Sequence, residues 1–310
     1  RNALALVRLQ PISGVGWGEF NLAWTLTPFP GRPTAFFDHT HNLPLELLVE
    51  LGVPMAGVVL GLMALALARA WQRCARAPGD RGAAGRGALL VVTMIGLHSL
   101  VEYPLWYSYF LLPAAFAWGF TLGMPDPARS DTVAPHDTLG RARIHWGAVA
   151  GLLMVMGGSA ALLDYRHIVE IYQPTEGNVL SLEARVARGQ LSPLFAHHAD
   201  YAAATTEGMP EAMRALGMLR APHNLLDTRL MMAWARHLDA SGRTDEARAL
   251  AERLREFHHA ESDAFFQACA ANRPVAFQCQ PARSAHDWRG YVVPGVPGVV
   301  PALPAASATQ

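Results

Sequence analysis

The sequence has 310 residues, of which 51% are hydrophobic and only 16% are charged, whereas soluble domains have roughly 25% charged residues. This shortage of charge predicts that part of the chain lies in a membrane. The formal net charge is zero, so no basic field favours nucleic acid, and we exclude nucleic acid as a partner. The chain starts at Arg1, without a signal peptide, inside what reads as a continuing segment, and we expect a fragment of a longer protein.

Four apolar stretches are candidates for membrane spans, because a bilayer core of about 30 Å needs roughly 17 to 25 helical residues. In chain order they are residues 43–68, 88–103, 104–122 and 146–163. Glu46 and Glu50 lie near the start of the first stretch, so we expect its hydrocarbon-spanning part to begin near Leu51. The second and third stretches meet at Pro104. Because the residue before a proline is pushed out of helical geometry, a tight hairpin is the economical interpretation there.

The arginines indicate how these spans are oriented. They cluster in the loop between the first two stretches and in the loop after the third: Arg69, Arg73, Arg76, Arg81 and Arg86, then Arg129, Arg141 and Arg143. Because arginine-rich loops stay in the cytoplasm, both loops are expected there, which requires residues 88–122 to cross as a pair. A single crossing would leave one arginine loop on the wrong side. The paired crossing puts residues 1–42, the hairpin at 102–106 and everything after Asp164 outside, in the periplasm of a host with two membranes.

A soluble helical domain is expected over residues 164–290, where charges return and helical periodicity appears. A helical hairpin is clearest, with apolar faces at Leu230, Ala233, Trp234 and Leu238 and at Ala247, Leu250, Leu254 and Phe257, separated by a break at residues 241–243. This segment is similar to the turn and second helix of a tetratricopeptide unit. One unit cannot bury its own face, so a generic helical domain remains the alternative.

Two further features complete the tail. Cys269 and Cys279 could pair if this segment lies in an oxidising compartment. Residues 291–310 are rich in proline and lack charge, so we expect them to be disordered. The predicted fold class is therefore all-α: polytopic transmembrane helices over residues 43–163, followed by a soluble, tetratricopeptide-like C-terminal domain.

The external segment before the first span contains a glycine-rich stretch at residues 14–18. GVGWG superficially resembles a phosphate-binding loop, but no β-strand precedes it, no lysine follows it, and Rossmann spacing is absent. We interpret it as a turn that leads to an interfacial aromatic pair, Trp17 and Phe20.

Residues 37–42 (FDHTHN) end directly before the first span and place two imidazoles and an amide at the outer membrane surface. A histidine there can take up a proton near neutral pH. As metal ligands His39 and His41 would need a third group, which only His98 or Glu102 could supply from another span. We therefore predict no metal and no cofactor. Histidines that are merely hydrogen-bonded at a helix start are the structural alternative.

The sequence around these histidines resembles the O-antigen ligase and polymerase superfamily. His41 and Asn42, followed after nine residues by Gly52, match its histidine-asparagine, nine-residue, glycine signature at the head of a span. PISGVGWGEFNLAW, FFDHTHNLPLELLVELGVP, HSLVEYPLWYSYFLLPAAFAWG and the helical tail are similar to the branch that contains the pilin O-oligosaccharyltransferases. Met55 departs from the pattern, since many ligases have a small residue there. The family also has further spans and donor-binding arginines upstream, of which Arg1 would be the last.

The resemblance implies an enzyme that moves a preassembled glycan from undecaprenyl diphosphate to an acceptor hydroxyl, outside the cytoplasmic membrane and without a metal or nucleotide sugar. Such a reaction needs positive groups for the diphosphate and a base for the acceptor proton. We assign His41 as the general base and His39 and Asn42 as groups that orient it. Arg32 and Arg1 are candidate diphosphate contacts.

His98 and Glu102 are further candidates for substrate binding. They are four residues apart and hence expected on one helix face, and an ionisable pair within a span is a functional candidate by default. A structural pair that closes the hairpin is the alternative.

The motif does not fix the acceptor, because ligases acting on lipid A core, polymerases and transferases acting on protein Ser or Thr share it. The helical domain favours a protein acceptor such as pilin, by analogy with peptide-binding helical domains. The alternative from another class is a membrane-anchored scaffold or remnant whose histidines are structural. The expected partners are the lipid-linked glycan, a protein or lipid-A-core acceptor and membrane lipids, at the bacterial inner membrane.

Overall fold

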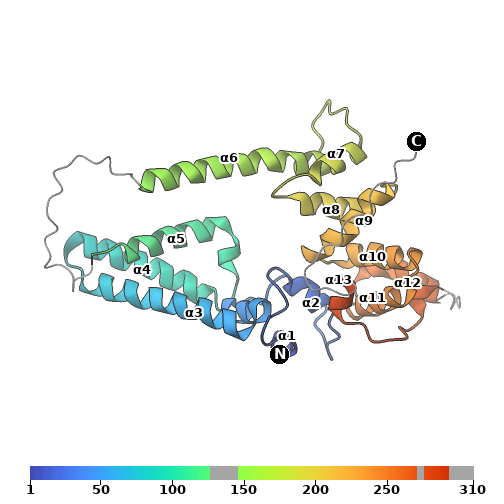
Figure 1. The fold of residues 1–310 in the computed structure, drawn as a ribbon, viewed down its shortest axis with the longest axis horizontal. Coiled ribbons are helices and arrows are strands. Elements are labelled where there is room, and N and C mark those ends of the chain that lie inside the picture. The colour runs from blue at the N-terminus through green and yellow to red at the C-terminus, as the bar shows by residue number, and fades with distance from the viewer. Residues whose placement is uncertain (126–145, 271–275, 293–310) are drawn as a thin grey trace. The chain divides into compact units, whose positions relative to one another are not determined.

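The computed structural model describes residues 1–125, 146–270 and 276–292, and within them every regular element is helical. The expected all-α fold class is thereby confirmed. The chain divides into two compact units, one of residues 1–20 with 38–146 and the other of residues 21–37 with 147–310. Figure 1 shows the helices that make up each unit.

The first unit is built on three helices that pack side by side (Figure 1). They are α3 (Leu43–Arg76), α4 (Gly79–His98) and α5 (Ser108–Leu122), and the short α1 (Asn2–Leu9) packs against α3. A 3-10 turn at Pro104–Trp106 separates α4 from α5, so residues 88–122 form two helices, as a paired crossing requires. Both α3 and α4 extend beyond their apolar stretches into the arginine-containing segment, because arginine is a good helix former.

The two ends of this bundle carry different chemistry. At one end the guanidinium of Arg73 binds the carbonyl of Leu122, and Arg86 donates to the carbonyl of Ala77 at 3.0 Å. At the other end the amide of Leu43 donates to the carbonyl of Ser99 at 2.7 Å, next to the histidine segment. Arginines and histidines thus lie at opposite ends, as a bundle oriented by cytoplasmic arginines would have them. The arginines at 129, 141 and 143 lie outside the described residues.

Helix α3 is interrupted at Gly52, whose φ of 73° lies in the left-handed region. A Cβ at this position would lie 2.3 Å from the carbonyl oxygen of Ile12, so the close approach of the loop after α1 also demands glycine. The break, together with Pro54, which has no amide hydrogen, leaves the carbonyls of Val49 and Glu50 without their usual helical partners.

The glycine-rich loop supplies those partners. The amides of Val15 and Gly16 donate to the two orphaned carbonyls at 2.8 and 3.0 Å. These amides serve the helix break, which explains the glycines without a phosphate ligand. The expected interfacial position is wrong for Phe20, which is only 1% exposed, and stays a prediction for Trp17, which is 68% exposed.

Among the described residues, two helices are long and apolar enough to cross a membrane, α3 and α6 (Trp146–Tyr172), and their apolar stretches are largely unburied. Helix α5 is apolar but has 15 residues, about 22 Å of helix. Helix α4 carries Asp80, Arg81 and Arg86 in its first half. Because the core helix of a soluble domain would be buried, these exposed apolar surfaces indicate a membrane protein.

The second unit is a helical domain into which α6 continues without a break at Asp164. Near the end of α6, Ile168 and Ile171 are buried against Val186 and Ala199. The other helices of this unit are α2 (Phe20–Leu26), α7 (Leu182–Gly189), α8 (Ala196–Thr205), α9 (Glu211–Arg220), α10 (Thr228–Ala240), α11 (Thr244–Glu256), α12 (Asp263–Ala270) and α13 (Trp288–Val292).

The hairpin expected over residues 226–259 is confirmed as α10 and α11, which pack against each other. The expected face residues are buried except Ala233, which is half-buried. Asp227 caps α10 by accepting from the amide of Leu230 at 2.8 Å, and Gly242 takes a φ of 80° in the turn. A second packed pair, α8 and α9, precedes this hairpin. The tetratricopeptide character of the domain is not confirmed.

Residues 21–37 fold with the second unit. The Asn21 side chain accepts from the amide of Leu226 at 2.7 Å across 205 residues of sequence, and Leu22 is buried in the same core. Phe36 stacks on Phe257 with ring centroids 4.0 Å apart. The segment before the first span is therefore divided between the units.

Cys269 and Cys279 form a disulfide with Cα atoms 5.2 Å apart, so the expected pairing is present. The prediction of disorder for residues 291–310 falls almost entirely outside the described residues, which end at 292.

Candidate functional site

The histidine segment and the α4–α5 connection meet at one end of the three-helix bundle. Nδ1 of His41 lies 2.8 Å from Oε2 of Glu102, and the His41 side chain is 36% exposed. His41 has a φ of 55°, a conformation that costs a non-glycine residue free energy and persists where its surroundings hold it. A carboxylate on one ring nitrogen fixes the tautomer and the orientation of an imidazole.

Asn42 holds this geometry in place. Its Oδ1 accepts from the amide of Leu45 at 2.9 Å and so caps the start of α3, while its Nδ2 donates to the carbonyl of Leu100 at 2.8 Å. One amide side chain therefore satisfies a helix-end donor and ties α3 to the residues that follow α4. The preceding Thr40 donates its hydroxyl to the carbonyl of Asn42 at 2.9 Å. These bonds set where the His41 ring can lie.

His39 lies on the buried side of the same segment. Its Nδ1 is 3.4 Å from Oε1 of Glu46, a carboxylate with a 2% exposed side chain, and its ring packs against Tyr103 and Trp106 at centroid distances of 4.7 and 4.8 Å. Burial lowers the pKa of His39, but contact with Glu46 and the charges of Asp38, Glu46 and Glu50 outweigh it, so the pKa is raised above its usual value. His39 therefore holds a proton more strongly than a free imidazole does, and its protonated ring would pair with Glu46.

Tyr103 connects the two histidines. Its ring contacts His39 and His41 edge-on, at 4.7 and 4.8 Å, and its hydrogen bond to Tyr107, followed by burial, raises its pKa to about 12. Sequence analysis missed this residue. The cluster YPLWYSY around it offered a signal, because it places three tyrosines directly after Glu102 in the hairpin.

The other expected site residues are distributed differently. Glu102 lies beyond the end of α4 at His98, so the expected placement of both on one helix face is wrong; α4 ends before Pro104, and Glu102 turns to His41 instead. His98 is exposed and has its ring 6.0 Å from that of Phe110. Arg1 is exposed at the start of α1.

Arg32 lies in the second unit and is held by that unit. Its side chain is 2% exposed, and its Nε is 2.9 Å from Oε2 of Glu256. The guanidinium also donates to the carbonyl of Trp24 at 3.3 Å and lies 4.4 Å from the Phe257 ring centroid. Burial lowers its pKa against the opposing effect of Glu256. These contacts give Arg32 a structural role in the second unit, and a diphosphate contact stays a prediction.

The described residues contain no group of three or more His, Cys, Asp and Glu side chains that could hold a metal ion. The arrangement at His41 is instead that of an imidazole with an orienting carboxylate, which suits proton transfer.

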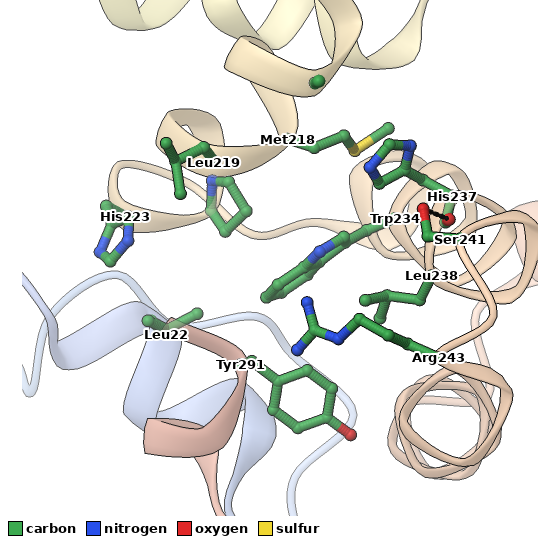
Figure 2. A pocket seen from close by; sticks show the side chains of 12 residues that line it. Leu22, Met218, Leu219, His223, Trp234, His237, Leu238, Ser241, Arg243 and Tyr291 are labelled. Carbon is green, nitrogen blue, oxygen red and sulfur yellow. Dashed lines mark hydrogen bonds between the residues drawn. The ribbon is translucent and has the colours of Figure 1, made fainter. Parts of the chain in front are cut away.

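A cavity of about 190 Å³ lies in the second unit. Figure 2 shows Trp234 and Tyr291 facing it, with Arg243 beside them. The two rings make an edge-on contact at a centroid distance of 5.5 Å, and Arg243 Nε donates to Glu246 at 2.9 Å. Trp, Tyr and Arg are the residue types that most often anchor bound proteins.

A wider groove of about 990 Å³ adjoins this cavity, since both are lined by Met218, His237 and Ser241. Its walls come mainly from α9 and α10 and carry side chains of both charge signs. Cavity and groove together form the candidate surface for a polypeptide in this unit.

Comparisons with known proteins identify the family of the chain. The family described as virulence factor membrane-bound polymerase, C-terminal, matches residues 87–273, more than half of the chain; the match includes Glu102 and begins after His41. The chain is also 26% identical over 152 residues to a general O-oligosaccharyltransferase of Acinetobacter baylyi, which covers 49% of this chain and 25% of that protein. The chain thus spans about a quarter of the length of this relative.

No solved structure matches the chain. The family match nevertheless covers the second half of α4, α5, α6 and most of the helical domain, so it includes parts of both units. The chain therefore belongs to the C-terminal family of the membrane-bound polymerases, within the O-antigen ligase and polymerase superfamily.

Proposed function

We propose that the chain serves a transferase that moves a preassembled glycan from undecaprenyl diphosphate to an acceptor hydroxyl, with His41 as the general base and Glu102 as the residue that orients it. The distance of 2.8 Å between His41 Nδ1 and Glu102 Oε2 carries this proposal. It joins the histidine of the superfamily signature to a carboxylate from the other side of the bundle end, which a capping role alone does not require.

The chemical step follows from this tautomer. With its Nδ1 proton donated to Glu102, the His41 ring has its basic lone pair on Nε2. The acceptor hydroxyl oxygen attacks the anomeric carbon of the glycan, and its proton passes to Nε2. The bond between the anomeric carbon and the diphosphate oxygen breaks, and the electron pair leaves with the diphosphate. Glu102 stabilises the imidazolium that forms.

The neighbouring contacts suggest roles for the other signature residues, Asn42 and Gly52, and for His39. Asn42 ties the segment to Leu100, His39 is held by Glu46, and Gly52 lets α3 break where the glycine-rich loop binds it. In this proposal only His41 exchanges a proton with substrate. His39 and Asn42 are positioning residues, and His98, Glu102 and Arg1 lie in the same unit as His41.

For the acceptor we propose Ser or Thr of a periplasmic protein such as pilin. The cavity and groove of the second unit support a polypeptide acceptor, because Trp234, Tyr291 and Arg243 at the cavity are of the residue types that most often anchor bound proteins. The disulfide supports an oxidising compartment for this unit. We accordingly propose that both the histidine segment and the second unit lie in the periplasm, and that the protein resides in the inner membrane.

The test is glycosylation of a periplasmic acceptor in cells that supply the lipid-linked glycan, read as a mobility shift, with substitutions made in the complete parent protein. His41→Ala should abolish transfer while membrane abundance stays unchanged, since removal of a general base costs roughly 10² to 10⁴ in rate. His39→Ala should be milder. His259→Ala, which removes a histidine with a 47% exposed side chain in the second unit, is the matched control.

Two outcomes would overturn the assignment. Transfer by His41→Ala near the wild-type level means that His41 is not the base. Loss of transfer only because the variant disappears from the membrane means that the histidine is structural. Loss of a single hydrogen bond costs about 1 kcal/mol of stability, which should leave the variant in the membrane. Activity and membrane abundance can then be measured separately, so that a catalytic role of His41 is distinguished from a structural one.

A further inference from the structure

A basic pocket lies beside the end of α6 in the second unit. It has a volume of about 520 Å³ and is formed by α6, residues 173–181 and α7. Its lining combines cationic, polar and apolar side chains: Leu163, Arg166, His167, Glu170, Asn178, Leu180, Arg185 and Arg188. Three guanidinium groups thus face one hollow that holds a single carboxylate.

The carboxylate of Glu170 is occupied by the pocket wall. It accepts from the hydroxyl of Thr175 at 2.5 Å and from the side chain of Asn178, and these hydrogen bonds lower its pKa. Arg185 donates to the backbone carbonyl of Glu170 at 2.5 Å. These bonds fix the segment after α6 against α7, so the pocket is a formed feature of the fold.

The other two guanidinium groups are not used by the fold. Within the described residues the side chains of Arg166 and Arg188 have no hydrogen-bond or ion-pair partner, and both residues are exposed. Elsewhere in the same unit Arg32, Arg243 and Arg253 all pair with carboxylates. Counting Glu170 against three arginines leaves the pocket with an excess of positive charge, which favours an anion.

Two apolar side chains line the same pocket, and others are exposed on the adjoining segments. Leu163, at its edge, is 61% exposed and belongs to the apolar part of α6, and Leu180 is 42% exposed. Val179 and Leu191, on the adjoining segments, are 95% and 84% exposed. Large aliphatic groups held this far out are costly in water and are typical of a surface that meets a membrane.

We propose that this pocket binds the phosphate of an anionic membrane phospholipid where α6 leaves the bilayer. Arg166 and Arg188 contact the phosphate, which planar guanidinium groups bind in pairs. Leu163 and Leu180 contact the adjoining acyl chains. The headgroup fixes the second unit at the membrane surface, and this role does not depend on the proposed catalytic function of His41.

The test uses the full chain purified in a neutral detergent and titrated with phosphatidylglycerol, followed by native mass spectrometry. Phosphatidylcholine with the same acyl chains and inorganic phosphate are the comparison probes. The double variant Arg166→Gln with Arg188→Gln should weaken phosphatidylglycerol binding by roughly 10- to 30-fold, because each arginine is expected to contribute about one contact to the headgroup. The matched control is Arg283→Gln with Arg289→Gln, which removes the same charge from exposed positions away from the pocket.

The expected result is preference for phosphatidylglycerol over phosphatidylcholine in the wild type and in the control pair, lost in the pocket pair. Equal binding of the two lipids by the wild type, or unchanged phosphatidylglycerol binding by the pocket pair, overturns the proposal. Full displacement of phosphatidylglycerol by millimolar inorganic phosphate also overturns it, because the site would then be one for soluble phosphate. Since the side chains of Arg166 and Arg188 have no partner among the described residues, loss of folding is not expected to obscure the result.

Discussion

Nδ1 of His41 and Oε2 of Glu102 lie 2.8 Å apart although 61 residues separate them in the sequence. The contact forms because Asn42 ties the start of α3 to Leu100 and the amide of Leu43 binds the carbonyl of Ser99. These two hydrogen bonds to backbone carbonyls hold His41 and Glu102 at this distance. Substitution of either His41 or Glu102 should therefore change the rate of proton transfer.

Replacing the carboxylate of Glu102 tests its orienting role. In Glu102→Gln the amide can donate to Nδ1 and favour the wrong tautomer, so transfer should fall by roughly 10² to 10⁴, and the pH dependence of the remaining activity should shift. Initial rates of glycan transfer by the parent protein across pH measure both effects. Asp38→Asn, which removes a 51% exposed carboxylate 4.0 Å from His39, is the control. A rate for Glu102→Gln equal to that of the control would remove Glu102 from the mechanism.

The requirement for glycine at position 52 can be measured as stability. Gly52→Ala places a Cβ 2.3 Å from the carbonyl oxygen of Ile12 at a φ of 73°, and strain of this kind costs roughly 1 to 3 kcal/mol. The melting temperature of the detergent-purified chain should fall. Gly57→Ala, in the same helix with open space around it, should leave it unchanged or raise it. Equal effects of the two substitutions would mean that the break in α3 does not need glycine.

Stability should also depend on the charge of His39. Its pKa is raised in the folded chain above the ordinary 6.5, so its contribution is fully present below about pH 6.5 and disappears as pH rises through the folded value. The wild type should therefore exceed His39→Gln in melting temperature by more at about pH 6 than at about pH 9. A difference that grows with pH would show that His39 is held neutral.

The disulfide should stabilise the helical domain. It closes a separation of 10 residues between Cys269 and Cys279, which corresponds to about 2 to 3 kcal/mol in the loop-entropy model. The double variant Cys269→Ser with Cys279→Ser should melt at a lower temperature, whereas Cys74→Ser, at a buried free cysteine, separates this effect from the loss of any thiol. Two reactive thiols at 269 and 279 in protein isolated without reductant would contradict the bond itself.

Topology can be read from the two exposed positions Asp80 and Ala240. We expect the segment containing Arg73 and Arg86 to be cytoplasmic and the second unit to be external, because arginines hold short loops inside. In a Cys74→Ser background, a membrane-impermeant thiol reagent added to intact cells should label Ala240→Cys and spare Asp80→Cys. Labelling of both positions, or of position 80 alone, would reverse or abolish the proposed orientation.

The helices were predictable where one physical signal dominated. Apolar length indicated α3 and α6, and a 3.6-residue period indicated α10 and α11, with Leu250 and Leu254 buried as expected. The bounds were less predictable, because α6 continues past Asp164 to Tyr172 and charged residues extend a helix as readily as apolar ones.

Long-range pairings at the site were out of reach of the sequence. His41 and Asn42 could be singled out by their spacing to Gly52, but spacing along one helix does not reveal that Glu102 binds His41. The same limit applies to Arg32, which looked available for a diphosphate and is held by Glu256. Contacts between side chains this far apart in the sequence are determined by tertiary packing rather than by local pattern.

The two carbonyls that the break in α3 leaves without helical partners accept hydrogen bonds from the amides of Val15 and Gly16. An unsealed break would draw water toward the helix axis and leave a flexible joint. Here the hydrogen bonds from the loop after α1 brace the break. The turn bearing Asn42 and the apolar part of α3 after Gly52 therefore form one rigid segment. A displacement of the glycine-rich loop would therefore be transmitted to the histidine segment instead of being absorbed by bending at Gly52.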